Sequence, residues 1–408
     1  MIDLTTLEPP KTPLSPSLLW VLQCAFSTPA ALPSGADSDA STWHLAERLG
    51  LAERIASRVA NNDLPAASRD RFRRALVRST ATALMYEGVA RELSTIAGKA
   101  RIPLVFLKGF ALFLLEIGPA GSRPFGDLDA LAPRSEAERL LNRLLDAGYE
   151  LRSEASTEQH LPIVVSPQGG AVEIHFALRG LGGAGHRGST FGELERRGEL
   201  TKLAQYPGES FVPTPQALAT HALVHGMRQH LLRPHTYPLF RMVGDLVDLL
   251  PRPAHWDHIE HRLGGDERFI SHRTLLAVRS LSTMLAEGEL PRPDDPSGSG
   301  RLLAHLIAGS LDDEYAASLG TSHLRQRLTE ARRSGELLAY LRRKLIVPHM
   351  HSSSEDTPRA QRSTIRRVGR GLLRQARAVH SRVRLRRRHI AASPAESDDP
   401  IELGRHED

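Results

Sequence analysis

Several residue classes are scarce in this chain of 408 residues. A single cysteine, Cys24, excludes an internal disulfide and fits a reducing compartment. Six tyrosines and three tryptophans offer few aromatic platforms on which single-stranded nucleic acid could stack. No apolar run approaches the roughly 20 residues that span a bilayer. Acidic residues precede the first lysine, Lys11, so the basic start of a signal peptide is missing. We therefore expect a cytoplasmic protein.

The net charge of +6 is concentrated near the C-terminus. Residues 358–392 hold twelve arginines and no acidic residue, so the rest of the chain is mildly acidic. Within this stretch apolar residues recur at spacings of three and four: Ile365, Val368, Leu372, Ala376, Val379 and Val383. This spacing predicts a basic amphipathic helix. Such a helix could lie on an anionic membrane, contact RNA or dock onto the acidic body, and the sequence leaves these alternatives open.

Changes in composition divide the chain into seven segments. We predict a loose leader (1–16), an N-terminal helical region (17–100), a central α/β core (101–213), a second helical domain (214–347), a linker (348–361), the basic amphipathic helix (362–390) and a disordered acidic tail (391–408). A glycine-rich loop, 179–190, leads out of the core strands.

Residues 101–177 alternate short apolar runs with helical pieces. The runs at 104–107, 127–131, 161–165 and 171–176 predict strands, and the pieces at 109–118 and 135–148 predict helices. Ser135 and Glu138 predict a capping box, and Gly148 is expected to close the same helix. The fold class that follows is α+β, with a small mixed sheet covered by helices.

Two aspartates one residue apart, Asp127 and Asp129, lie within an otherwise apolar run. In a strand, residues i and i+2 point to the same face, so these carboxylates project together. We place Leu128 and Leu131 on the opposite, core-facing side or at its edge. If the run carrying Glu173 is a neighbouring strand, three carboxylates converge, as the oxygen ligands of Mg²⁺ do.

Basic residues flank this run on its N-terminal side. Lys108 and Gly109 end one predicted strand and open a helix, an arrangement suited to phosphate. Arg123 could provide a second positive contact, or could instead be a structural partner of Asp127. Lys108 could equally pair with one of the acids.

Three histidines and two further aspartates are candidates of a weaker kind. His175 shares a strand face with Glu173 and could orient a metal ligand, bind substrate or hydrogen-bond within the sheet. His221 and His225 lie four residues apart, a spacing that can bind zinc, but no third ligand is evident, so we expect core or substrate-cleft histidines. We expect Asp245 and Asp248, on one helical face, to anchor arginines such as Arg241 rather than to bind metal.

The ordered series "LKG", "R…GDLD" and "VEIH", followed by "H…H" and "GDLVDLL", resembles the uncharacterised bacterial nucleotidyltransferase family of the DNA polymerase β-like superfamily. The similarity covers about residues 43–263. It implies metal binding and catalysis by Asp127 and Asp129, with Glu173 as the third acid. Lys108 and Gly109 match the glycine turn, although the wider superfamily has Gly-Gly or Gly-Ser there.

The function that this resemblance implies is Mg²⁺-dependent transfer of NMP from an NTP to a hydroxyl or phosphate acceptor. The nucleotide and metal would be held by Asp127, Asp129 and Glu173, with Lys108, Gly109, Arg123 and His175 on the cofactor side. We expect the acceptor to be a small molecule, peptide or protein rather than a nucleic acid. The alternative is a catalytically degenerate fold that binds nucleotide or a protein partner.

Overall fold

The computed structural model describes residues 4, 7–8, 14–26, 40–152, 159–178, 190–230, 239–252, 254–264, 271–312 and 315–316. These residues belong to one compact unit, 1–337, and the second unit, 338–408, lies outside them. The predicted linker, basic helix and acidic tail therefore lie outside the described residues, as do most of the leader and almost all of the glycine-rich loop. Among the described helices, none is long and apolar enough to cross a membrane.

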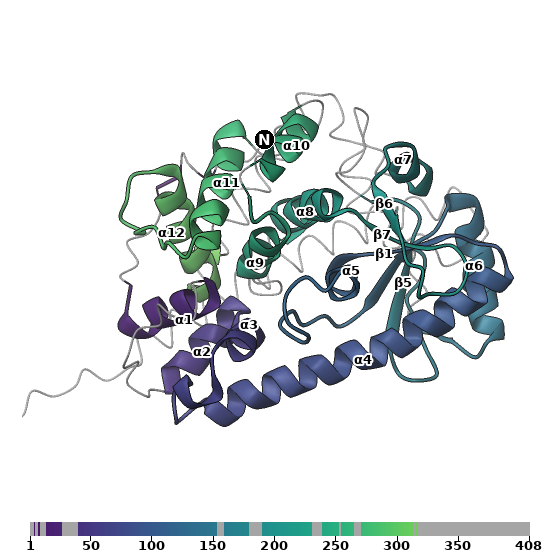
Figure 1. The fold of residues 1–408 in the computed structure, drawn as a ribbon, viewed down its shortest axis with the longest axis horizontal. Coiled ribbons are helices and arrows are strands. Elements are labelled where there is room, and N and C mark those ends of the chain that lie inside the picture. Colours follow the sequence, from purple (N-terminus) through teal and green to yellow (C-terminus); the bar gives the residue numbers. More distant parts are fainter. Residues whose placement is uncertain are drawn as a thin grey trace, which may run out of the picture. The chain divides into compact units, whose positions relative to one another are not determined.

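The centre of the described chain is a mixed sheet of seven short strands (Figure 1). Its spatial order is β3-β4-β5-β2-β1-β7-β6. The β1–β7 and β2–β5 pairs are parallel, and the other four pairs are antiparallel. The strands are β1 (Leu104–Phe106), β2 (Leu128–Leu131), β3 (Glu150–Leu151), β4 (Val164–Val165), β5 (Ala171–His175), β6 (Leu200–Lys202) and β7 (Ser210–Pro213).

Helices precede, cover and follow this sheet, so the α+β class predicted from the sequence is confirmed. Before it come α1 (Pro16–Phe26), α2 (Ala40–Leu49), α3 (Ala52–Arg58), the short 3₁₀ helix η3 (Asn61–Asp63) and α4 (Arg69–Lys99). Between its strands lie α5 (Lys108–Leu114), α6 (Arg134–Asp146) and α7 (Phe191–Arg196). After it come α8 (Pro215–Val224), the π-helix η4 (His225–His230), α9 (Leu239–Leu249), α10 (His255–Gly264), α11 (His272–Ala286) and α12 (Gly298–Leu311).

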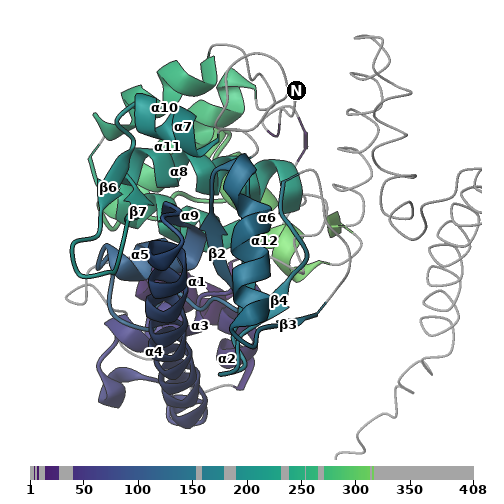
Figure 2. The same cartoon turned by 90° about the vertical axis from the view of Figure 1, so that its right-hand side faces the viewer.

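The two faces of the sheet have different neighbours. Leu128 and Ala130 of β2 join the main hydrophobic core, to which α4 and α6 also contribute. These two helices contact each other and lie side by side in Figure 2. Leu131 belongs to a smaller cluster with Phe191 and Leu194 of α7. The placement of Leu131 opposite the acid pair is therefore wrong: alternation along β2 puts it on the same face as Asp129.

Helix ends in the core depart from the sequence prediction in two places. The expected capping box is wrong, because α6 begins at Arg134 after Pro133 and no side chain caps it. Gly148 does follow the end of α6, with a φ of 89° that favours glycine. The helix expected at 109–118 ends at Leu114, and Glu116 and Gly118 then have φ values of 55° and 79°.

Candidate functional site

The parallel pairing of β2 and β5 brings the acidic residues together. In this register Asp129 lies opposite Glu173, and Leu131 lies opposite His175. The ligand atoms of Asp129, Glu173 and His175 all lie within 4.8 Å of one another. Asp127 is half-buried one residue before β2 and is not one of these three residues, although its charge interacts with theirs. The sequence expectation that the two runs are neighbouring strands is thus met.

Lys108 contacts the acidic group, which consists of Asp127, Asp129 and Glu173. Its Nζ donates to Asp129 Oδ1 at 2.5 Å. The backbone delivers it there: Leu107 N donates to the carbonyl oxygen of Asp129 at 3.0 Å, and Lys108 then takes a φ of 52°, uncommon for a residue with a side chain. Of the two roles that the sequence left open for Lys108, the one observed is an ion pair with an acid.

Gly109 is required by close packing. A Cβ added at this position would lie 2.9 Å from the Cβ of Phe125, in the loop that leads to Asp127. Only glycine lets the start of α5 pass this close to the loop. The glycine of the "LKG" stretch therefore fixes the distance between the turn and the segment that carries the first acid.

His175 orients Asp129. Its Nε2 lies 2.7 Å from Asp129 Oδ1 and 3.5 Å from Glu173 Oε2. Burial acts to lower the pKa of His175, but the hydrogen bonds to both carboxylates outweigh it and raise this pKa. Of the roles that the sequence left open for His175, hydrogen bonding to a ligand carboxylate is the one observed.

The carboxylates differ in their electrostatic surroundings. Burial acts to raise the pKa of Asp129, but the charge of Lys108 and the hydrogen bond from His175 hold it well below its usual range. The hydrogen bond with His175 likewise lowers the pKa of Glu173. Burial, together with the charge of Asp129, raises the pKa of Asp127 to about 6. The ionised form of Asp127 is therefore less favoured than that of Asp129 or Glu173.

Arg123 binds an acid outside this group. Its Nε and Nη2 donate to Asp245 of α9 at 2.8 and 3.2 Å. One turn further along α9, Asp248 receives Arg54 of α3, at 2.5 and 2.8 Å. Asp245 and Asp248 thus anchor arginines, as expected, and the carboxylate that Arg123 is shown to hold is Asp245.

Tyr86 of α4 contacts the backbone beside both acidic strands. Its hydroxyl donates to the carbonyl oxygen of Gly126 at 2.6 Å and accepts from Ala171 N at 3.2 Å. Gly126 directly precedes Asp127, and Ala171 lies two residues before Glu173. Sequence reasoning missed this residue, because a tyrosine on the buried side of a long helix carries no signal of its distant partners.

Two spaces lie near the acids, although Asp127, Asp129 and Glu173 line neither of them. A cleft of about 420 Å³, within the usual range for small-molecule ligands, lies along α4, α5 and the loop after α5, and Gly109 and Arg123 line it. A cavity of about 40 Å³ is lined by Lys108 and by His221 and His225, whose rings stack with centroids 5.7 Å apart. Among the described residues, these two histidines belong to no group of three metal-ligating side chains.

Comparison with known proteins identifies one family. The family described as "uncharacterised nucleotidyltransferase" matches residues 37–266, which is more than half of the chain and includes every element of the sheet and of the acidic group. No curated protein and no solved structure matches the chain.

Proposed function

Because the chain belongs to the uncharacterised nucleotidyltransferase family, we propose that it is a Mg²⁺-dependent transferase that moves NMP from an NTP, such as ATP, to a hydroxyl or phosphate acceptor. The acceptor would be a small molecule, a peptide or a protein. One observation carries the proposal: Asp129 and Glu173 lie opposite each other on neighbouring parallel strands, and Asp127 directly precedes the first of these strands.

The residues present fit a divalent cation. Carboxylate oxygens are the ligands that Mg²⁺ prefers, and Asp127, Asp129 and Glu173 would supply them. Lys108 and His175 both contact Oδ1 of the Asp129 carboxylate, so Oδ2 stays available to a ligand. Burial and the charge of Asp129 raise the pKa of Asp127, and a nearby cation would lower it again. Such a cation would supply activation of the acceptor and stabilisation of the leaving pyrophosphate.

The protein's own residues would set the geometry of the reaction. In the transfer, the acceptor oxygen bonds to the α-phosphorus and the bond from that phosphorus to pyrophosphate breaks. His175 keeps Asp129 in one orientation, and Lys108 holds the same carboxylate oxygen through an ion pair. Gly109 and Phe125 hold the turn and the Asp127 loop in close contact.

The test compares Asp127→Asn and Asp129→Asn with the wild-type protein. With Mg²⁺ and α-labelled NTP, the wild type is expected to label itself or an added acceptor, and both variants to lose the label while remaining folded by circular dichroism. Asp146→Asn is a matched control, because this side chain is 73% exposed at the end of α6. Equal labelling by wild type and both site variants would overturn the assignment.

One observation favours a second candidate, a degenerate fold that binds nucleotide without transfer. Lys108 and His175 already give Asp129 two nitrogen partners, so the buried carboxylate has its negative charge balanced. Calorimetry separates the candidates: NTP binding without release of pyrophosphate supports the degenerate fold, whereas binding followed by release supports transfer.

A further inference from the structure

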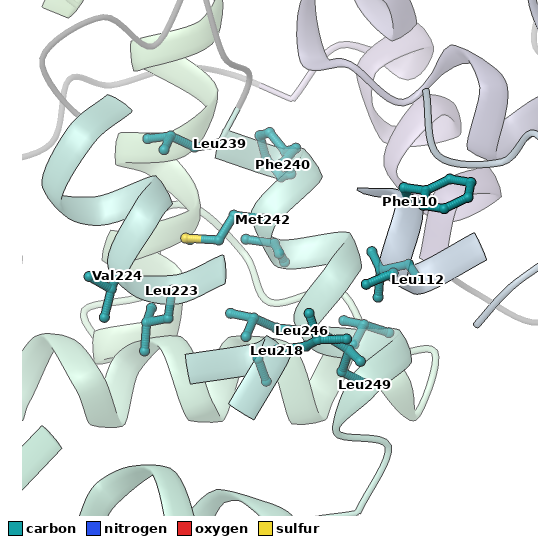
Figure 3. Packing of buried hydrophobic residues seen from close by; sticks show 14 of the residues in the cluster. Phe110, Leu112, Leu218, Leu223, Val224, Leu239, Phe240, Met242, Leu246 and Leu249 are labelled. Atoms are coloured by element: carbon teal, nitrogen blue, oxygen red, sulfur yellow. The ribbon is translucent and has the colours of Figure 1, made fainter. Parts of the chain in front are cut away.

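The cavity of about 40 Å³ lies where α5, α8 and α9 meet. Its apolar wall is formed by Leu112 of α5, Leu218 of α8 and Leu249 of α9, which lie close together in Figure 3. The space is large enough for a water molecule or a hydroxymethyl group. The cavity is therefore large enough for the end of a small group.

His221 gives this cavity a polar wall. The residue is 6% exposed, and neither Nδ1 nor Nε2 has a hydrogen-bond partner in the part of the chain that the structure describes. A buried polar group without a partner costs about 1–3 kcal/mol. A ligand hydroxyl in the adjoining space could pair with one of the two ring nitrogens and would remove that part of the cost.

The cavity also adjoins the acidic group. Lys108 lines it and, through Nζ, binds Asp129. A group held by His221 would therefore lie next to the lysine that contacts the acids. This places the cavity within the region where the proposed transfer takes place.

The surroundings select an uncharged hydroxyl rather than a phosphate. The two cations on the wall, Lys108 and Arg123, are paired with Asp129 and Asp245. A neutral imidazole has one donor and one acceptor nitrogen, and an alcohol hydroxyl also donates and accepts. Burial, with the nearby charge of Lys108, lowers the pKa of His221 to about 3, which agrees with a neutral ring.

We propose that His221 binds an alcohol hydroxyl of a substrate in this cavity, with the adjoining carbon atoms against Leu112, Leu218 and Leu249. The inference rests on the proposed function and specifies it, since the hydroxyl belongs either to the ribose of the NTP or to the acceptor.

The first part of the test addresses the ribose. Dissociation constants are measured by calorimetry for the four NTPs and their 2′,3′-dideoxy analogues, with wild type, His221→Phe and His221→Asn. Loss of one hydrogen bond of ordinary strength corresponds to roughly 5- to 10-fold in affinity. If the ribose is bound, the wild type prefers an NTP over its analogue by about this factor, and His221→Phe binds both equally.

The second part addresses the acceptor, with glycerol as the probe. If an acceptor alcohol is bound, wild type does not distinguish the two nucleotides, but glycerol stimulates formation of glyceryl-NMP and pyrophosphate. His221→Phe loses this stimulation, and His221→Asn, which keeps a donor and an acceptor, retains part of it. His44→Asn serves as the control and keeps the wild-type response, because the His44 side chain is 62% exposed on α2.

The outcomes separate this inference from the proposed function. Loss of ribose discrimination or of glycerol stimulation in a folded His221→Phe supports a hydroxyl site. If wild type shows neither effect, or if folded His221→Phe fully retains the effect that wild type shows, the inference is overturned. Intact transfer with neither effect refutes the inference alone, and ribose discrimination without any transfer refutes the proposed function alone.

Discussion

Tyr86→Phe tests whether the helix beneath the sheet positions the acids. The substitution keeps the ring, which packs against Phe125 with centroids 5.6 Å apart, and removes only the hydroxyl. That hydroxyl joins the backbone of Gly126, before Asp127, to Ala171, at the start of β5. Removing the hydroxyl breaks this link between the segment before β2 and the start of β5, and it does not create a large cavity.

The size of the effect follows from the exposure of the two partners. Gly126 is exposed, so water can replace the hydroxyl at its carbonyl oxygen. Ala171 is 6% exposed, so its N–H stays unpaired, and the free energy of unfolding should fall by about 1–3 kcal/mol. Because residues that hold metal ligands typically contribute 10- to 100-fold to affinity or activity, we expect Mg²⁺-supported transfer to require roughly 10-fold more metal.

Two measurements on one preparation of Tyr86→Phe test this prediction. Urea unfolding gives the stability, and a Mg²⁺ titration of label transfer gives the metal requirement. Tyr149→Phe is the matched control, because its buried hydroxyl contacts Glu92 at 3.4 Å and neither acidic strand. If Tyr86→Phe loses stability but keeps the wild-type Mg²⁺ requirement, Tyr86 is merely structural and the positioning argument is refuted.

Two further perturbations act on packing and on charge. Gly109→Ala should lower the free energy of unfolding by about 1–3 kcal/mol through the contact with Phe125, as measured by urea unfolding. Adding Phe125→Ala to this variant should recover part of the loss. Gly126→Ala is the control and should not show the clash, because its Cβ would enter open space. The folded pKa of His221 is about 3, below its ordinary 6.5. The unfolded chain therefore binds the proton first, and stability should fall as pH drops below 6.5, by about 2 kcal/mol at pH 5. This part of the pH dependence should vanish in His221→Phe, and an unchanged profile would contradict the assigned pKa.

Strands with an apolar, alternating pattern were predictable from sequence. The sequence predicted the runs that form β1, β2, β4 and β5 because apolar residues dominate them. By contrast, β3 is fully exposed and β6 nearly so, and neither run carries a hydrophobic period. The capping-box pattern failed because the sequence motif does not fix where the first helical turn begins, and α6 starts after a proline.

The convergence of the acids was predictable only as a condition. Alternation placed Asp127 with Asp129, and Glu173 with His175, but the pairing of their strands depends on contacts more than 40 residues apart in the chain. The partners of Tyr86 and Arg123 are separated from them by 40 to 122 positions, and no local pattern encodes such contacts. The sequence therefore predicts which functional side chains lie together within one strand or helix, but it does not predict the distant residues that hold them in place.

The charge balance around Asp129 bears on whether the site is competent. Lys108 and His175 use Oδ1 of this carboxylate, so they fix its orientation without occupying Oδ2. Asp127 and Glu173 bring two further carboxylates, whereas the basic groups beside them are Lys108 and His175, whose pKa the carboxylates raise. Even with His175 protonated, three carboxylates face two cations, and burial followed by the charge of Asp129 raises the pKa of Asp127 to about 6. A divalent cation bound there would offset this cost, which is the physical reason to prefer a cation-binding site over a vestigial one.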